Sequence, residues 1–288
     1  MFVSQGAPVR TVTRWLILAA AWLVATATPA QALRFGVVNQ RSPHLTAQYW
    51  NPILEHVSRK SGVALELHIG KSAPDTTAMA VRGELDVYYT NHLFNAERDQ
   101  LGWRVFGRAA GDGIRAEIVV AADSPIVTLA QLQDKGVVFA SPEAFLGYWV
   151  PMDALLKARV QVNAQFAGNQ EGAMAQLRSG AASAAGVNAR IMAEYAKRVD
   201  LNYRTLWSSE RYLDLALMAH PRVPAAVVER LRAAFIGMAQ DPEGQRVLEA
   251  SAAVSRQQPP FGFVAAANRD YENYRSFYRA ALVRPQAP

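Results

Sequence analysis

Apolar positions along the chain switch between two spacings from Leu33 onward, and this switching predicts strands and helices in turn. Residues 33–38 form a compact apolar run typical of a strand, and residues 45–60 repeat apolar side chains at helical spacing. Gly62 is placed to end that helix as its C-terminal cap. Residues 63–69 then alternate apolar and polar positions, which predicts the next strand.

The rest of the chain continues this alternation. Strands are expected over residues 85–89, 103–106, 117–121, 184–187 and 213–219. Helices are expected over residues 76–82, 93–100, 170–179, 188–198, 227–240 and 271–282. Repeated strand–helix–strand units predict an α/β fold with parallel-rich sheets covered on both faces.

One strand ends in a pattern that points to a binding site. The apolar run 137–140 leads directly into Ser141 and Pro142, which suit the N-cap and the first position of a helix. We therefore expect an amphipathic helix to begin there, just beyond the carboxyl end of a strand. In open α/β sheets ligands bind at such ends, because unpaired N–H groups and the positive end of the helix dipole face the crevice.

Residues 1–32 have the pattern of a secretory signal peptide. Arg10 and Arg14 precede a largely apolar run, and Ala30-Gln31-Ala32 fits the small-x-small cleavage rule, so the mature chain is expected to start at Leu33. The alternative is a membrane anchor, but the run of about 14 residues is short of the roughly 20 needed to span a bilayer. Cleavage predicts a periplasmic location.

Composition narrows the classes of function. The signal removes two of the 30 basic residues and none of the 24 acidic ones, which leaves a mildly basic mature chain without a cluster of Lys or Arg, so nucleic-acid binding is not expected. The chain has no cysteine, its five histidines show no metal-ligand spacing, and no cofactor motif is present. His56 and His68 are expected at the surface. Catalytic motifs such as Gly-x-Ser-x-Gly are absent, so an enzyme is not expected.

Four ordered segments of the mature chain resemble a known family. They are Leu-Arg-Phe-Gly-Val-Val (33–38), Tyr-Trp-Asn-Pro-Ile-Leu (49–54) with Ser61-Gly62, Gly-Glu-Leu-Asp-Val-Tyr-Tyr-Thr-Asn (83–91), and Ser141-Pro142 with Gly147-Tyr148 and Pro151. In this order and spacing they resemble the periplasmic substrate-binding proteins of phosphate, phosphite and phosphonate ABC transporters.

The resemblance implies a type II periplasmic-binding-protein fold, in which two α/β lobes joined by a two-strand hinge close on a small anionic ligand. One lobe would comprise residues 33–115 plus 217–288 and the other residues 116–216, with crossing strands near 116–121 and 213–219. The closed protein, expected as a monomer, would dock on an ABC permease. Two alternatives are open: docking on the exported domain of a sensor histidine kinase, and an enzyme on the same fold.

The chain departs from the family pattern at three places. Ala144, Phe145 and Leu146 stand where phosphonate-binding members carry a Ser/Thr-rich trio, which removes three hydroxyl donors. Asn169-Gln170-Glu171 replaces a Ser-His pair, and Arg190 stands where members that hold an aminoalkyl group carry a carboxylate. Asp214 fits the acidic position before the last strand. The expected ligand is therefore a small anion other than an aminoalkyl phosphonate, either another oxyanion or a carboxylate with an apolar portion that packs against Phe145.

Residues in loops at the carboxyl ends of strands, and at the hinge, are the candidate ligand contacts. The guanidinium of Arg190 could bind a carboxylate or phosphate with two hydrogen bonds. Tyr148 is expected either in the core or at the ligand, and Tyr212 either at the ligand or at the crossover. The full set is Gln40, Arg41, Ser42, His44, Tyr89, Thr90, Asn91, Ser141, Ala144, Phe145, Tyr148, Gln170, Asn188, Arg190, Tyr212 and Asp214.

Overall fold

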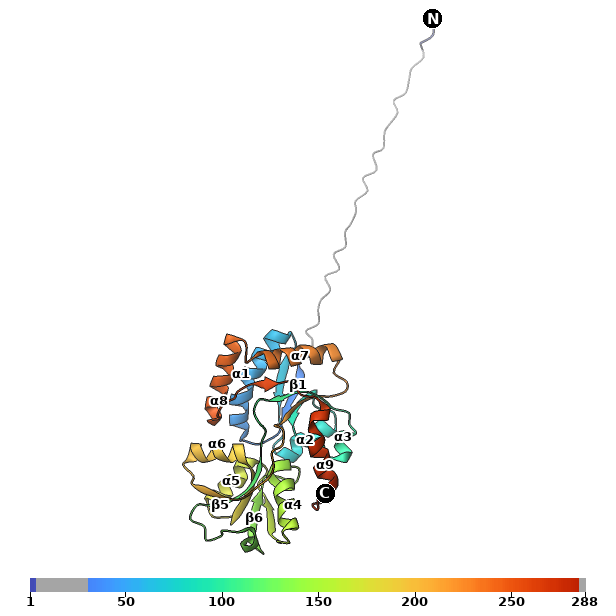
Figure 1. Cartoon of the computed structure of the whole chain (residues 1–288). Helices are drawn as coiled ribbons and strands as arrows, with labels where there is room; N and C mark the ends of the chain where they lie inside the picture. Colours follow the sequence, from blue (N-terminus) through green and yellow to red (C-terminus); the bar gives the residue numbers. More distant parts are fainter. Residues whose placement is uncertain (4–30, 285–288) are drawn as a thin grey trace. The chain divides into compact units, whose positions relative to one another are not determined.

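The computed structural model describes residues 1–3 and 31–284 (Figure 1), and residues 31–284 form the fold. The expected signal peptide falls almost wholly on residues 4–30, which lie outside the described residues. Within the described part, no helix has the length and apolar character needed to cross a membrane.

Two mixed β-sheets form the framework, which confirms the expected α/β class. The six-stranded sheet has the order β11-β4-β10-β3-β1-β2 and the five-stranded sheet the order β7-β6-β8-β5-β9. The first contains β1 (Leu33–Val37), β2 (Leu65–His68), β3 (Val87–Thr90), β4 (Arg104–Ala109), β10 (Ala216–Ala219) and β11 (Phe263–Val264). The second contains β5 (Ala116–Ala121), β6 (Gly136–Phe139), β7 (Asn163–Phe166), β8 (Ala184–Asn188) and β9 (Tyr203–Ser208).

Helices pack against both sheets (Figure 1). Their bounds are α1 (Pro43–Ser61), α2 (Ala73–Val81), α3 (Ala96–Asp99), α4 (Val150–Lys157), α5 (Gln170–Arg178), α6 (Ala189–Val199), α7 (Ala225–Gly237), α8 (Pro242–Ser255) and α9 (Glu272–Ala280). Short 3₁₀ turns lie at Leu129–Leu132 and Asn268–Tyr271, and one π-helical turn, η2, lies at Phe145–Trp149. α1 and α7 contact the six-stranded sheet, whereas α5 and α6 contact β8 of the other.

Parallel pairing is confined to one end of each sheet. β1 pairs in parallel with β2 and β3, and β6 pairs in parallel with β7 and β8. β5, β9 and β10 pair antiparallel with their neighbours. β5 and β10 each follow a segment where the chain passes from one sheet to the other, and β9 directly precedes the second of these segments.

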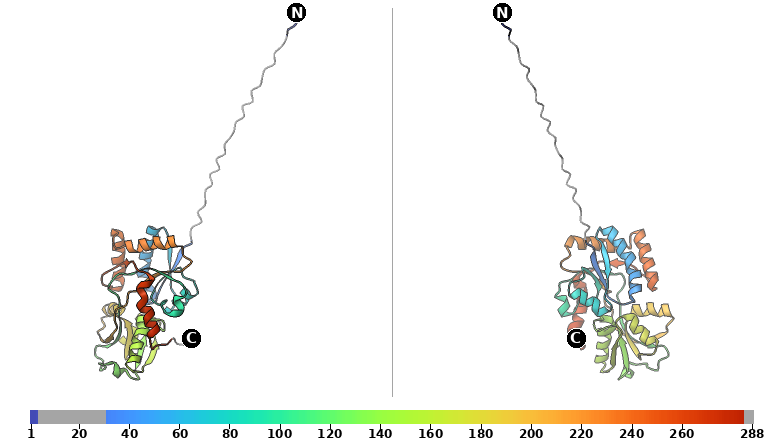
Figure 2. Two further views of the ribbon diagram at one scale, coloured as in Figure 1. Left: turned by 45° about the vertical axis from the view of Figure 1, so that its right-hand side comes forward. Right: turned by 180° about the vertical axis from the view of Figure 1, so that it is seen from behind.

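The two crossing segments, 110–115 and 209–215, run side by side. The backbones of Ile114 and Tyr212 form an antiparallel bridge, with hydrogen bonds of 2.7 and 2.8 Å. A third link comes from the C-terminal end: Leu282 donates its N–H to the Asp153 carboxylate of α4 at 2.6 Å. Figure 2 shows α9 (red) extending from the six-stranded sheet toward the other one, where Tyr278 of α9 packs edge-on against Trp149 of η2 with 5.0 Å between ring centroids.

Local capping signals define α1 as expected. The Ser42 hydroxyl accepts the Leu45 N–H at 3.3 Å, and Pro43 takes the first helical position. At the other end Gly62 adopts φ 65° and donates its N–H to Ser58. A left-handed residue at this point is far less strained in glycine than in residues with a Cβ.

The helix expected to begin at Ser141 is wrong in its starting point. Residues 141–144 form a turn, η2 follows with i→i−5 bonds from Trp149 to Ala144 and from Val150 to Phe145, and α4 begins only at Val150. Pro151 has no N–H to donate to the Gly147 carbonyl, and that carbonyl instead accepts the Ala140 N–H at 3.3 Å. The proline therefore accounts for the departure from an ordinary α-helical register.

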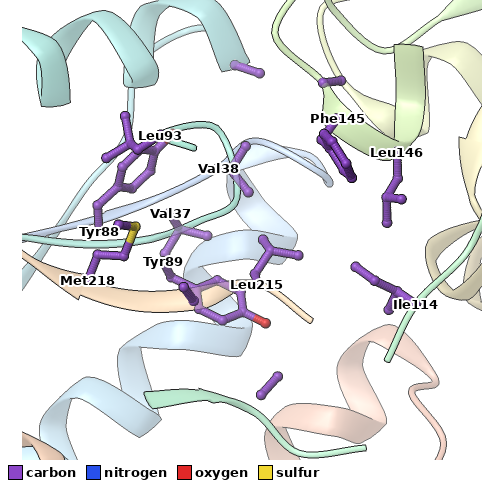
Figure 3. Packing of buried hydrophobic residues seen from close by; sticks show 14 of the residues in the cluster. Val37, Val38, Tyr88, Tyr89, Leu93, Ile114, Phe145, Leu146, Leu215 and Met218 are labelled. Atoms are coloured by element: carbon purple, nitrogen blue, oxygen red, sulfur yellow. The ribbon is translucent and has the colours of Figure 1, made fainter. Parts of the chain in front are cut away.

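The larger apolar core extends from the six-stranded sheet across the crossing segments to η2. Figure 3 shows Val38 and Leu215 opposite Phe145 and Leu146. Three smaller expectations are wrong. Only residues 96–99 of the expected helix 93–100 are helical, and the last strand begins at Ala216 rather than at 213. His56, expected at the surface, is 1% exposed because it lies on the face of α1 that packs against α8.

Candidate functional site

A narrow pocket lies where the loops after β1, β3, β6 and β8 converge. It is lined by Val38, Asn39, Gln40, Ala73, Asn91, His92, Ala140, Ser141, Ala144, Phe145, Leu146, Gly147, Gln170 and Asn188. These residues come from both sheets, so the pocket lies between the two α/β parts of residues 31–284. We call it the first pocket.

The Ser141 hydroxyl is the most unusual group in the first pocket. The residue is 1% exposed, and its Oγ has no hydrogen-bond partner among the described residues. It does not cap a helix, contrary to expectation, because its carbonyl rather than its hydroxyl accepts the Ala144 N–H at 3.1 Å. A buried hydroxyl without a partner costs about 1–3 kcal/mol, so its presence calls for an explanation.

Backbone donors of η2 line the same pocket. As the first residues of a helical turn, Phe145, Leu146 and Gly147 have no acceptor for their N–H groups within the helix. None of the three donates in the backbone hydrogen bonds of the described residues. The N–H of the candidate Ala144 is already donated to the Ser141 carbonyl. The donors available on this side of the pocket are thus one hydroxyl and three amides.

Gln170 packs directly onto this turn. Its Oε1 accepts the Asn188 N–H at 3.2 Å, and its Nε2 lies where a side chain on Gly147 would be, 2.3 Å from an ideal Cβ. Asn188 in turn caps α6, since its Oδ1 accepts the N–H groups of Arg190 and Ile191. Because Gly147 has no side chain, α5 and η2 can approach each other closely at this point.

His92 is neutral in this setting. Its Nδ1 lies 3.0 Å from the Thr77 hydroxyl, and burial, with a smaller contribution from Arg98, lowers the pKa of the imidazole to about 3. The Thr90 hydroxyl accepts the His92 N–H at 2.9 Å, so Thr90 holds this loop. Among the described residues, no charged side chain lines the first pocket.

The candidates Arg41 and Arg190 lie in an adjoining pocket, which shares Val38 and Gln40 with the first and also includes Tyr49 and Tyr89. Arg190 was expected to be available for an anion, but it forms two hydrogen bonds to the Asp214 carboxylate, one of 3.1 Å. Arg41 is paired with Glu194. Burial, followed by the charge of Asp214, raises the pKa of Tyr89 well above its usual value, so its hydroxyl remains a donor.

The remaining candidates lie outside both pockets. Ser42 caps α1, His44 is exposed, and Tyr148 packs edge-on against Phe139 and Phe166 at 5.2 and 5.0 Å between ring centroids. Tyr212 lies edge-on to Phe145 at 4.9 Å and so supports the wall of the pocket from behind. The lining residues that the sequence did not single out include Asn39, His92, Leu146 and Gly147. His92 directly follows the candidate Asn91, which was the one available signal.

One group of side chains has metal-like spacing. Ligand atoms of His56, Asp241 and Glu243 lie within 4.8 Å of one another, on α1 and at the start of α8. Lys60 and Arg59 already neutralise the two carboxylates, at 2.9 and 2.7 Å. A divalent cation would have to displace both, so we assign no metal to this group.

Comparison with known proteins places this arrangement among transport proteins. The family model described as "ABC transporter, phosphonate, periplasmic substrate-binding protein" matches residues 35–271. No curated protein matches the chain.

Solved structures resemble the chain in fold. PhnD1 from Prochlorococcus marinus in complex with methylphosphonate has a TM-score of 0.72 at 17% identity, over 86% of this chain and 97% of that one. A binding-protein component of an ABC phosphonate transporter from Pseudomonas aeruginosa has a TM-score of 0.72 at 16% identity, over 85% of each chain. The periplasmic aliphatic sulphonate binding protein SsuA from Escherichia coli has a TM-score of 0.56 at 14% identity, over 86% of this chain and 85% of that one. The fold expected from the resemblance is therefore confirmed.

Proposed function

Since this chain belongs to the family of periplasmic substrate-binding proteins of phosphonate ABC transporters, we propose that its first pocket binds a small phosphonate or a related phosphorus oxyanion. The family consists of transport binding proteins rather than enzymes. A relative in fold binds methylphosphonate, which supports a ligand of that size.

The unpaired Ser141 hydroxyl carries the proposal. Together with the N–H groups of Phe145, Leu146 and Gly147 it forms a set of donors without acceptors. An oxyanion supplies several acceptors at once, and hydrogen bonds to a charged acceptor contribute about 1.5–3 kcal/mol each. The backbone thus takes over from the hydroxyl trio that the sequence lacks at residues 144–146.

The other lining residues favour a small ligand that carries no ammonium group. Val38, Phe145 and Leu146 offer an apolar wall for a carbon substituent, and His92 is neutral. The nearby carboxylates of Asp214 and Glu194 are paired with Arg190 and Arg41, so neither is free to hold an ammonium group. We therefore propose an alkylphosphonate or phosphite in preference to an aminoalkyl phosphonate.

Transport requires release as well as capture. We propose that lobes comprising residues 33–115 plus 217–288 and residues 116–216 close by bending at the crossing segments 110–115 and 209–215, and that the closed monomer docks on an ABC permease. Cleavage after Ala32 would release it into the periplasm. The comparisons give no support to the alternative in which the closed form docks on a sensor histidine kinase.

A thermal-shift screen tests the ligand class. A ligand at 100 times its Kd stabilises the folded protein by about 2.7 kcal/mol. We expect methylphosphonate and phosphite to raise the Tm of the purified protein by several degrees, and 2-aminoethylphosphonate to raise it less. A Tm that responds to sulphonates or carboxylates but to no phosphorus oxyanion would overturn the proposal.

A further inference from the structure

The loop between β1 and α1, residues 39–42, is held from both sides by carboxylates of helices that pack on the five-stranded sheet. On one side Glu171, in the first turn of α5, accepts the Ser42 N–H at 2.7 Å and donates its own N–H to the Gln40 carbonyl at 3.2 Å. On the other side Glu194 of α6 is paired with Arg41. Gln40 lies between them and lines both pockets.

Glu194 is buried, Glu171 is partly buried, and both carboxylates are neutralised. The Glu171 side chain is 14% exposed and is paired with Arg198, which also reaches the Ser255 carbonyl of α8 at 3.5 Å. The Glu194 side chain is 3% exposed and lies 3.8 Å from Arg190 Nε on the same helix. Each anion is therefore compensated within the protein, and neither Glu171 nor Glu194 lines the first pocket.

These contacts are not required by the helices that carry them. Asn169 caps α5 through the Gly172 N–H at 2.8 Å, and Asn188 caps α6. What the two carboxylates add is a connection to a loop of the other sheet. The Ser42 N–H, at the start of α1, already has an anionic acceptor in Glu171.

Building on the proposed function, we propose that Glu171 and Glu194 form a closure clamp, which holds Gln40 in the ligand pocket and sets the rate of ligand release without touching the ligand. Both are positioning residues. Opening the cleft would break the bonds to Ser42, Gln40 and Arg41 together, so the clamp favours the closed state even before ligand binds. When the closed state is already populated without ligand, less of the binding free energy is used to close the cleft, and the apparent affinity is higher.

Lobe distances measured without ligand test the clamp directly. Arg178 on α5 and Glu249 on α8 are both exposed. Because the chain contains no cysteine, Arg178→Cys and Glu249→Cys introduce the two thiols to which distance labels can be attached. We expect Glu171→Gln and Glu194→Gln to broaden the distribution of distances between the two labels toward longer values. Glu229→Gln, which breaks an exposed pair with Arg232 within α7, is the matched control and should leave it unchanged.

Release kinetics provide the second measurement. For methylphosphonate we expect each clamp variant to raise the dissociation rate about tenfold (about 1.4 kcal/mol) with little change in the association rate. Arg41→Ala should act like Glu194→Gln, and Arg41→Lys should restore most of the wild-type rate because it keeps the charge. Clamp variants with wild-type distances and wild-type release would overturn the clamp.

The two proposals fail differently. If the wild-type protein binds no phosphorus oxyanion, the proposed ligand is wrong, while the distances still decide the clamp. Should a variant fail to fold, hydrogen exchange of the wild-type protein replaces it. The N–H groups of Ser42 and Glu171 should then exchange through one shared opening, and unequal opening free energies would contradict the clamp.

Discussion

The ring centroids of Phe145 and Tyr274 lie 4.2 Å apart. Phe145 belongs to η2, which follows β6 in the chain, whereas Tyr274 belongs to α9 near the C-terminal end. Phe145 lines the first pocket on its other side. The Tyr274 hydroxyl donates to the Leu213 carbonyl of a crossing segment at 2.6 Å. A residue that walls the pocket is thus supported by a helix anchored to the crossing segment.

We expect Tyr274→Ala to lower both stability and ligand affinity. Loss of a buried aromatic ring costs about 3–5 kcal/mol, and Phe145 would lose its support. Tyr274→Phe keeps the ring and loses the hydrogen bond to Leu213, so it should cost about 1 kcal/mol and leave affinity close to wild type. Urea unfolding and calorimetric titration distinguish the two. Wild-type affinity in Tyr274→Ala would show that α9 does not position Phe145.

Gly147→Ala should weaken ligand binding. The added Cβ would lie 2.3 Å from Gln170 Nε2, so α5 or η2 must shift and the amide donors move with them. Gly237→Ala is the matched control, because a Cβ there meets nothing within 4 Å. Titration of both variants with methylphosphonate should give an affinity loss of tenfold or more for the first alone. Equal affinities would place the ligand away from η2.

Stability should fall in mild acid because of His92. Its pKa is about 3 in the folded state and near 6.5 when unfolded, so the unfolded state binds more protons between these values. Stability from this group is complete above about pH 6.5 and is lost as the pH falls toward 3, with a limiting slope of about 1.4 kcal/mol per pH unit. Urea unfolding from pH 7 to 4.5 should show a shallower decline for His92→Asn than for wild type. Identical slopes would mean that His92 titrates normally.

Asp214→Asn should destabilise the protein more than removal of both partners. The variant leaves the largely buried Arg190 without its carboxylate, at a cost of about 3 kcal/mol. The double variant Arg190→Met with Asp214→Leu leaves no uncompensated charge and should recover part of that loss. Chemical denaturation of the three proteins measures the order. A double variant less stable than Asp214→Asn would indicate that the pair contributes more than mutual neutralisation.

Local signals in the sequence predicted the elements that depend on local chemistry. Ser42 with Pro43 starts α1 and Gly62 ends it, because capping involves only neighbouring backbone groups. The helix start predicted directly after β6, at Ser141, was wrong, and the reason is also physical. Ser141 and Pro142 favour a helix start, but Pro151 ten residues later removes a donor and the turn takes a π register instead. Two local preferences competed, and the pattern at residues 141–142 did not reveal the competitor.

The candidate site was predicted in part for the same reason. Loops at strand ends pointed to Gln40, Asn91, Ser141, Gln170 and Asn188, all of which line the first pocket. The states of charged side chains depend on partners remote in sequence, such as Asp214 for Arg190 and Glu194 for Arg41. Spacing within one segment carries no information about such partners, so these side chains were expected to be free.

Calorimetric titration of methylphosphonate and phosphite into the wild-type protein and Ser141→Ala decides whether the first pocket holds a phosphorus oxyanion. We predict that wild type binds and that Ser141→Ala binds at least tenfold more weakly. In the absence of ligand the variant should be as stable as wild type or more so, because an unpaired buried hydroxyl is removed. Equal affinity in the two proteins, or a ligand-free variant that is clearly less stable, would contradict the assignment of Ser141 to the oxyanion.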